Sequence, residues 1–497
     1  MGYLSIIDDT IIIAYFIIVL GIGLYYSRKR DQDSSDYFLA GRNTGWLAVG
    51  ISLFATNISS EHFLGLAGSG ATRGIAVGQF EWMAIFILLL LGYVFAPLYI
   101  KAGVYTVPEF IEKRFDRRSR LYLTSISILA YIITKISVSL FAGGLILHEI
   151  LDWDIYTSTL IMVLLTGLYT VIGGLKAVIY TQIFQTVIFL GGALLLTLFG
   201  LHEVGGLNGL YSKLPADYFT MIKPASDPDF PWTGILFGAP IIGFWYWCTD
   251  QYIVQRVLAA RNISEARKGT FLTAGLKILP MFLLVIPGLI AVALFPGVKG
   301  DQAYPFLLTS RILPVGIRGI VIAGVFAAIM SSLASVFNST STLFTMDFYR
   351  SINPGASERK LVLVGRLATT LMVVTAILWV PLIKFISSEI YIYLQSVQAF
   401  ISPPIAALFI MGVSYKKVNS KGAIYGLVLG GLIGLVRLLL EMLDHSALLN
   451  YSVVTWFVNI NYLHFAVLLF AISSATMVLV SRLNTVTVLE PLDYKNI

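Results

Sequence analysis

The sequence predicts an all-α polytopic membrane protein with about thirteen transmembrane helices. Its 497 residues are 57% hydrophobic and only 12% charged, and the mean hydropathy is +0.83. A soluble domain carries roughly 25% charged residues, so this composition indicates a chain that lies mostly in lipid. Apolar runs of the ~20 residues needed to cross a bilayer recur along the chain. Two of these runs are interrupted by polar residues near the middle.

We number the predicted spans in chain order. Their approximate cores are 7–26, 45–70, 79–100, 121–147, 155–173, 177–200, 232–254, 269–295, 317–346, 361–382, 391–413, 423–441 and 462–481.

The first span begins with Asp8 and Asp9, and a basic cluster follows it, which is the reverse of a secretory signal peptide. We therefore expect it to be retained as a helix. Basic residues gather in the loops after odd-numbered spans, and the positive-inside rule then places the N-terminus outside and the C-terminus in the cytoplasm. Those loop residues are Arg28, Lys29, Arg30, Arg42, Lys113, Arg114, Arg117, Arg118, Arg120, Arg256, Arg261, Arg267, Lys268, Arg350, Arg359, Lys360, Lys416, Lys417 and Lys421.

The formal charge of +7 is distributed over these short loops, so we interpret it as a topology signal and expect no nucleic-acid partner. The only cysteine, Cys248, lies in an apolar span and excludes an intrachain disulfide. This fits a bacterial inner membrane better than an animal cell surface. We expect a multi-pass protein of the cell membrane that is a monomer or a weak oligomer in the bilayer.

The second span is interrupted by residues 55–62, Ala-Thr-Asn-Ile-Ser-Ser-Glu-His, and glycines at Gly65, Gly68 and Gly70 are expected to weaken the helix further. Five spans later, residues 245–251, Trp-Tyr-Trp-Cys-Thr-Asp-Gln, interrupt the seventh span. Lipid offers no partner for freed backbone groups, so such breaks must face a protein-lined cavity. Broken helices at corresponding positions of two halves are typical of alternating-access transporters.

The two interrupted spans are five spans apart, and because five is odd they cross the membrane in opposite directions. This predicts two structural repeats with inverted topology. The predicted units are an extra helix and first cytoplasmic loop at 1–44, a first repeat at 45–200 and an extracellular connector with a short surface helix at 201–229. A second repeat at 230–413 follows, and 414–497 holds two additional helices and a cytoplasmic tail.

Enzymes and channels are less compatible with the sequence. A channel needs repeated rings of carbonyls or charges, and none is evident. No HExxH, GxSxG or CxxC motif occurs, so we expect neither catalysis nor an organic cofactor. The five histidines are widely separated, at His62, His148, His202, His445 and His464.

A series of short motifs, in order from about residue 37 to 440, resembles the sodium/solute symporter family. They are 57–59 (Asn-Ile-Ser), 80–83 (Phe-Glu-Trp-Met), 107–110 (Val-Pro-Glu-Phe), 113–115 (Lys-Arg-Phe), 173–178 (Gly-Gly-Leu-Lys-Ala-Val), 331–335 (Ser-Ser-Leu-Ala-Ser), 345–347 (Thr-Met-Asp), and Lys417 followed by 421–423 (Lys-Gly-Ala). The segment 245–251 with 254–256 (Val-Gln-Arg) is similar to sodium/glucose cotransporters and their myo-inositol relatives.

This resemblance implies a LeuT-type five-plus-five inverted repeat. It also implies a secondary transporter that couples inward Na⁺ movement to uptake of a hexose of the glucose or galactose type. A symporter for myo-inositol or another polyol stays open as an alternative, as does a sodium-dependent sugar sensor without net transport.

Na⁺ is a hard cation that takes oxygen ligands, and an unwound helix frees carbonyls for it. The resemblance assigns the ligands to the carbonyls of Ala55, Ile58 and Ala328 and to the hydroxyls of Ser331 and Ser332. The alternative is that both serines only bond the carbonyls of their own helix four residues back. Many relatives carry an aspartate where this chain has Gln182, and a neutral amide predicts one Na⁺ per sugar.

A hexose needs hydrogen-bonding side chains for its hydroxyls and an aromatic platform for its apolar faces. The resemblance assigns that role to Asn57, His62, Glu81, Tyr246, Trp247, Lys277 and Gln395. It assigns the outer lid to Leu66, Phe80 and Tyr391, and Tyr246 is also the inner gate.

Several assignments have alternatives. Glu81 and Lys277 could instead extend to the membrane surface, and His62 could be an ordinary buried histidine. We expect Gln395 rather than Gln398 to face the site. Relatives carry a polar residue at the position of Gly243, so one hydroxyl of the sugar is expected to lack a hydrogen-bond partner here. Three further intramembrane charges are Lys135, Arg366 and Arg437, of which Lys135 lies near the predicted site.

Overall fold

The structure is a computed structural model that describes residues 4–27, 33–151, 154–298, 300–379, 390–442 and 452–484. The basic residues 28–30 and the predicted cytoplasmic tail beyond residue 484 lie outside the described residues, as does the end of the predicted tenth span.

The described part of the chain is built from helices, several of which contain short 3₁₀ or π segments (η). In chain order they are α1 (Ile6–Ser27), α2 (Ser34–Leu39), η1 (Ala40–Arg42), α3 (Trp46–Asn57), η2 (Glu61–Leu66), α4 (Ala67–Arg73), η3 (Gly74–Val77), α5 (Gly78–Leu90), η4 (Leu91–Phe95), α6 (Ala96–Ala102), α7 (Val107–Arg114), α8 (Arg117–Ala130), η5 (Tyr131–Ile136), α9 (Ser137–Leu151), α10 (Ile155–Val204), α11 (Gly206–Lys213), η6 (Ala216–Phe219), α12 (Trp232–Phe237), α13 (Ala239–Phe244), η7 (Trp245–Thr249), α14 (Gln251–Leu258), α15 (Ile263–Leu276), η8 (Met281–Val285), α16 (Ile286–Leu294), η9 (Gly300–Gln302), α17 (Ala303–Thr309), α18 (Ile317–Leu343), η10 (Phe344–Tyr349), α19 (Arg350–Ile352), α20 (Glu358–Trp379), α21 (Ile390–Ser414), α22 (Ser420–Met442), α24 (Ser452–Asn459) and α25 (Tyr462–Leu483).

Within the described residues, ten helical stretches are long and apolar enough to cross a membrane, and some of them join more than one helix. The helix from Tyr156 to Val204 contains the predicted fifth and sixth spans, and the one from Glu61 to Ala102 contains the end of the second span and all of the third. The seventh predicted span is divided among α12, α13, η7 and α14. The helical regions therefore agree with the thirteen spans expected from the sequence.

The chain folds back on itself inside α10 at Gly174, where φ is 54° and ψ is −155°. A left-handed φ of this kind is open to glycine at little cost. Tyr169, before this point, donates to the Met330 carbonyl at 3.4 Å, while Gln185, after it, donates to the Tyr15 hydroxyl at 3.2 Å. The Tyr15 hydroxyl in turn lies 3.6 Å from the Met330 sulfur. A straight helix would separate Tyr169 and Gln185 by about 24 Å, so the two halves must run side by side.

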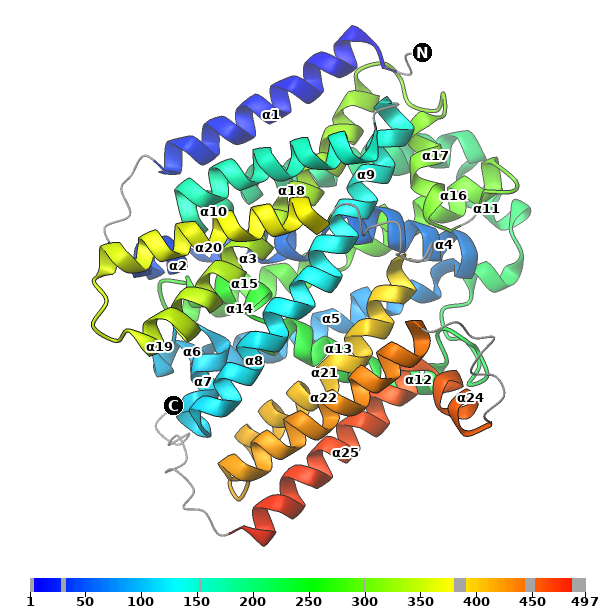
Figure 1. Ribbon diagram of the computed structural model, residues 1–497. Helices are drawn as coiled ribbons and strands as arrows, with labels where there is room; N and C mark the ends of the chain where they lie inside the picture. The colour runs from blue at the N-terminus through cyan, green and yellow to red at the C-terminus, as the bar shows by residue number, and fades with distance from the viewer. Residues whose placement is uncertain are drawn as a thin grey trace.

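The helices form two groups (Figure 1). In one group, α1, α10 and α20 surround α18, which packs against all three. In its most apolar stretch 94% of the α18 residues are buried, so this helix is the core of the fold rather than a lipid-facing span. At the other edge α21, α22 and α25 pack on one another. The broken helices lie between these groups.

Both predicted interruptions are present. The helix α3 ends at Asn57, Ile58 is extended with φ −71° and ψ 116°, and the chain becomes helical again at η2. The segment η7 ends at Thr249, Asp250 is extended with φ −79° and ψ 123°, and α14 then begins. The two breaks thus have nearly the same backbone geometry.

The glycines after the first break have a different role from the one expected. Gly65, Gly68 and Gly70 lie in helical backbone, so the interpretation that they interrupt the helix is wrong. A Cβ at Gly70 would lie 2.6 Å from the Val285 carbonyl oxygen, and one at Gly65 would lie 3.0 Å from the Tyr391 Cβ. These glycines allow the half-helix to approach its neighbours closely.

The described basic loops that follow the odd-numbered spans meet at one end of the molecule, as the sequence predicts. They are joined by side-chain hydrogen bonds from Arg42 to Gly103, from Arg261 to Asn43, from Arg117 to Ser351 and from Arg114 to Gly412. Arg256 is an exception, and its expected place in the loop after the seventh span is wrong: it lies in α14, completely buried, where it donates to the Ser335 hydroxyl. In the connector after α10, the expected short helix is α11.

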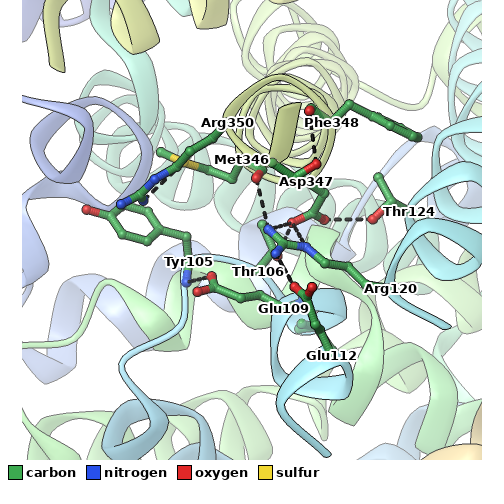
Figure 2. A network of polar contacts seen from close by, with 12 residues as sticks. Tyr105, Thr106, Glu109, Glu112, Arg120, Thr124, Met346, Asp347, Phe348 and Arg350 are labelled. Carbon is green, nitrogen blue, oxygen red and sulfur yellow. Dashed lines mark hydrogen bonds and ion pairs between the residues drawn. The ribbon is translucent and has the colours of Figure 1, made fainter. Parts of the chain in front are cut away.

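A polar network centred on Asp347 ties this end together (Figure 2). Asp347 is completely buried, and the Arg120 guanidinium donates to its Oδ1 from two nitrogens at 2.9 and 2.7 Å. Thr106 and Thr124 donate to the two carboxylate oxygens at 2.6 and 2.7 Å. Arg120 also pairs with Glu112. Because these residues come from α7, α8, η10 and the turn before α7, the network fastens a surface helix to two spans.

We expect Asp347→Asn to lower the thermal stability of the purified protein strongly. The amide removes the charge that Arg120 needs, and breaking one partner of a buried pair costs about 3–5 kcal/mol. Glu112→Gln is the matched control on the same arginine. The Glu112 side chain is 32% exposed, and an exposed partner contributes only about 0–1 kcal/mol. Equal shifts of the melting temperature in detergent would contradict this difference.

Candidate functional site

A cavity lies beside the two breaks. Side chains from both broken helices line it, together with side chains from α5, the end of α15 and α21. Every residue that the sequence analysis assigned to a sugar lines this one cavity: Asn57, His62, Glu81, Tyr246, Trp247, Lys277 and Gln395.

A buried lysine organises one wall. Lys277 follows directly after α15, and its Nζ donates to the Asn57 Oδ1 at 2.8 Å and pairs with Glu81 near the start of α5. Lys277 is 1% exposed and Glu81 is 4% exposed, so neither side chain extends to the surface. The Asn57 Nδ2 donates to the Tyr246 hydroxyl at 3.1 Å. Asn57 therefore connects the lysine to the aromatic ring of the other broken helix.

His62 lies between two carboxylates. Its Nε2 is 3.6 Å from Glu81 and its Nδ1 is 3.7 Å from Glu61. Glu61 in turn pairs with Lys135 at 3.1 Å. The sequence analysis did not single out Glu61, although an acidic residue within an apolar span is costly enough to be a signal in itself.

Four buried charges in and behind the cavity wall form two ion pairs, Lys277 with Glu81 and Lys135 with Glu61, and His62 lies between the two carboxylates. Lys135 itself does not line the cavity. Neither lysine is left over to neutralise a negatively charged ligand. This arrangement suits an uncharged molecule that offers hydroxyl groups.

The remaining walls are aromatic and apolar. Trp247 lies under the Lys277 ammonium, 5.5 Å from the ring centroid. A Cβ at Gly243 would lie 2.5 Å from the Ile87 Cδ1, so Ile87 occupies the space that a side chain at Gly243 would need. Met83 and Ile87 line the cavity here. Where relatives have a polar side chain, this cavity therefore has an apolar wall formed by Met83 and Ile87.

Phe80 and Tyr391 cover the cavity together. Their rings make an edge-to-face contact with centroids 5.9 Å apart, and Gln395 donates to the Tyr391 hydroxyl at 2.9 Å. Both rings line the cavity. Leu66, the third residue expected in the lid, is completely buried and does not line it. Gln398 lines the cavity as Gln395 does, so the expectation that only Gln395 faces it is wrong.

Four of the five residues assigned to Na⁺ contact one another in pairs where α3 ends. The Ser331 hydroxyl donates to the Ala55 carbonyl at 2.8 Å, and the Ser332 hydroxyl lies 3.5 Å from the Ile58 carbonyl. Both serines reach across to the broken helix, whereas Ser335 bonds a carbonyl of its own helix. Ala328 lies one turn earlier on the same face of α18 and is completely buried. Neutral carbonyl and hydroxyl oxygens of this kind fit Na⁺.

Gln182 lies directly behind these hydroxyls. Its amide nitrogen donates to Ser331 at 2.9 Å and to Ser335 at 2.8 Å, and its oxygen accepts from Ser52. Arg256, which is fully buried, donates to the same Ser335 hydroxyl at 2.6 Å. The charge beside Gln182 is therefore positive.

The family model of the sodium:solute symporter family matches residues 37–430. The chain belongs to this family. Sodium/glucose cotransporter 4 of Mus musculus is 41% identical to it over 95% of this chain and 75% of the relative. Sodium/glucose cotransporter 1 of Oryctolagus cuniculus is 40% identical over 95% of this chain and 78% of the relative. The resemblance expected from the motifs is confirmed.

Solved structures show the same fold. The chain superposes on a substrate-bound, outward-open Na⁺-coupled sialic acid symporter with a TM-score of 0.83 and 24% identity, covering 97% of this chain and 99% of that one. Mhp1, a nucleobase-cation-symport-1 family transporter, gives a TM-score of 0.56 and 16% identity over 91% of this chain and 96% of its own. These structures confirm the expected all-α, LeuT-type fold.

Lys277→Met is expected to destabilise the protein because it leaves the Glu81 carboxylate buried without its cation, at about 3–5 kcal/mol. The double variant Lys277→Met/Glu81→Gln removes both charges and is expected to recover most of the loss. Thermal unfolding of both variants in detergent measures this coupling. Additive losses in the double variant would show that the two side chains do not depend on each other.

Proposed function

We propose that this family member is a secondary active transporter that couples inward Na⁺ movement to uptake of a neutral hexose of the glucose or galactose type. One observation carries the proposal. The Asn57 side chain faces the cavity, and the Ala55 and Ile58 carbonyls, within one turn of it, face the α18 hydroxyls. The same break in one helix thus serves both the proposed ion and the proposed sugar.

The substrate class is supported by charge and by the relatives. Lys277 in the cavity wall and Lys135 behind it are both paired with carboxylates, which favours a neutral polyhydroxyl compound over an anionic sugar. The named relatives at 40–41% identity are sodium/glucose cotransporters. A Na⁺-coupled symporter of myo-inositol or another polyol uses the same chemistry and is the second candidate.

The mechanism follows from the shared break. Na⁺ between residues 55–58 and α18 would replace the Ser331 and Ser332 contacts and hold the break against the core helix. Asn57 is then fixed toward Lys277 and Tyr246, so the sugar site is already ordered when the sugar arrives. Positive coupling of this kind is reciprocal, because each ligand lowers the ordering cost of the other. Phe80 and Tyr391 close the outer side, and Tyr246 closes the inner side.

We further propose one Na⁺ per sugar. Gln182 is neutral and the buried Arg256 shares its Ser335 contact, so a second cation would meet positive rather than negative charge. At a membrane potential of about 100 mV, the entry of one Na⁺ supplies about 2.3 kcal/mol, and a tenfold Na⁺ gradient adds about 1.4 kcal/mol. This free energy is enough to accumulate the sugar roughly 500-fold inside the cell.

The proposed orientation has the N-terminus outside and the C-terminus in the cytoplasm, because the end at which the basic loops meet faces the cytoplasm under the positive-inside rule. The proposed setting is a cell membrane of the bacterial inner-membrane type. Both proposed sites are formed by one chain, so the proposed working unit is the monomer, with Na⁺ as the coupling ion and no organic cofactor.

Purified protein in liposomes is expected to accumulate labelled glucose or galactose only when an inward Na⁺ gradient is imposed. Ser332→Ala removes an ion ligand and is expected to raise the Na⁺ concentration for half-maximal uptake by about tenfold or more. Ser212→Ala, on the exposed helix α11, is the control. Competition by mannose and myo-inositol separates the two candidate substrates. Sugar binding without any uptake would identify a sensor instead.

Gln395→Ala is expected to raise the KM for sugar by about tenfold while the Na⁺ dependence stays near normal. The loss corresponds to one or two hydrogen bonds to sugar hydroxyls together with the release of Tyr391. Uptake at varied sugar and fixed Na⁺ measures it, and Gln302→Ala at the surface serves as the comparison. An unchanged KM would remove Gln395 from the sugar site.

A further inference from the structure

Lys135 and Glu61 form a buried ion pair that the proposed sugar and ion sites do not use. Both Glu61 carboxylate oxygens lie near the Lys135 ammonium, at 3.1 and 3.3 Å. The residues are 4% and 7% exposed, and both lie in helical stretches that are long and apolar enough to cross a membrane. Buried charges in a membrane are costly and are usually retained for function.

The Lys135 ammonium also lies against the proposed inner gate. Its Nζ is 4.8 Å from the centroid of the Tyr246 ring and 5.6 Å from that of Tyr252. A desolvated cation over an aromatic face is strongly attracted to the ring. Asn57 donates a hydrogen bond to the Tyr246 hydroxyl, so Asn57 fixes the hydroxyl end of the ring and Lys135 contacts its face.

One face of the fourth span contacts both breaks. Tyr131 and Lys135 are four positions apart in the π-helical segment η5. Tyr131 donates to Asp250 at the second break, while Lys135 pairs with Glu61, three positions after Ile58 at the first break. Tyr252 completes the connection, because its hydroxyl donates to the Thr56 carbonyl at 2.5 Å.

We propose that Lys135 is a positioning residue that couples the Na⁺ site to the Tyr246 gate, with Glu61 as its link to the first break. This inference rests on the proposed function. While Na⁺ holds residues 55–58 against α18, Glu61 is fixed and keeps the ammonium on the face of Tyr246, so the inner side stays closed. When Na⁺ leaves, the break relaxes and Glu61 withdraws. The lysine then no longer holds the ring, and the gate opens to the cytoplasm.

The test measures coupling rather than transport alone. In liposomes, Lys135→Met is expected to raise sugar-independent ²²Na⁺ flux by about tenfold and to lower the number of sugars moved per Na⁺. Lys135→Arg keeps a cation over the ring and is expected to stay close to wild type. Lys223→Met is the matched control, because Lys223 is also 4% exposed and also pairs with a carboxylate, that of Asp217, but lies in the connector after α10.

Two further variants separate gating from folding. Glu61→Gln/Lys135→Met leaves no stranded charge, so it remains measurable if the single variant does not fold, and the same leak is expected. The exchanged pair Glu61→Lys/Lys135→Glu keeps the ion pair but removes the cation from its place over Tyr246, so the leak is expected to persist. Tight coupling in the exchanged protein or in the neutral pair would overturn the proposal. Wild-type protein without Na⁺-stimulated uptake would overturn the proposed function instead.

Discussion

The structure depends on how two unwound helices satisfy their backbone groups within membrane-spanning segments, because lipid offers no hydrogen-bond partner for them. At the first break, three consecutive or nearly consecutive carbonyls are contacted by side chains from other helices. Ser331 donates to Ala55, Tyr252 to Thr56, and Ser332 lies at Ile58. At the second break, Tyr99 donates to the Cys248 carbonyl at 2.7 Å. Tertiary contacts thus replace the hydrogen bonds that a continuous helix would make within itself.

These replacement contacts explain why the break can be both stable and movable. A hydroxyl that donates to a carbonyl can rotate and present a lone pair to a cation instead. In the proposed mechanism, Ser331 and Ser332 hold the chain in the absence of Na⁺ and bind Na⁺ when it arrives. Since Asn57 lies between the carbonyls that they contact and also lines the cavity, the proposed ion site and the proposed sugar site share one segment of backbone.

The two buried ion pairs beside the cavity impose a second constraint. In a region of low dielectric, each of Lys277, Glu81, Glu61 and Lys135 needs its partner. The cavity is consequently polar enough to bind hydroxyls but has little spare charge. Removing any one of these side chains leaves another without a partner, so the charges act as a unit. His62 lies between the two pairs and connects them.

The amino-acid sequence by itself determined the membrane class, the helical spans and both breaks, because hydropathy and polar interruptions are local properties of the chain. The residues that meet in the cavity were identified by the resemblance of the motifs to a known family and not by these local properties. Only the tertiary structure decided which charges pair. Glu61 and Lys135 lie on different spans, and nothing in their local sequences shows that they meet. The same holds for the glycines after the first break, whose role is close helix packing, and for Leu66 and Gln398, whose distance from the cavity depends on helix rotation. Contacts of this kind depend on the mutual placement of helices distant in sequence, and periodicity within a single helix does not encode it.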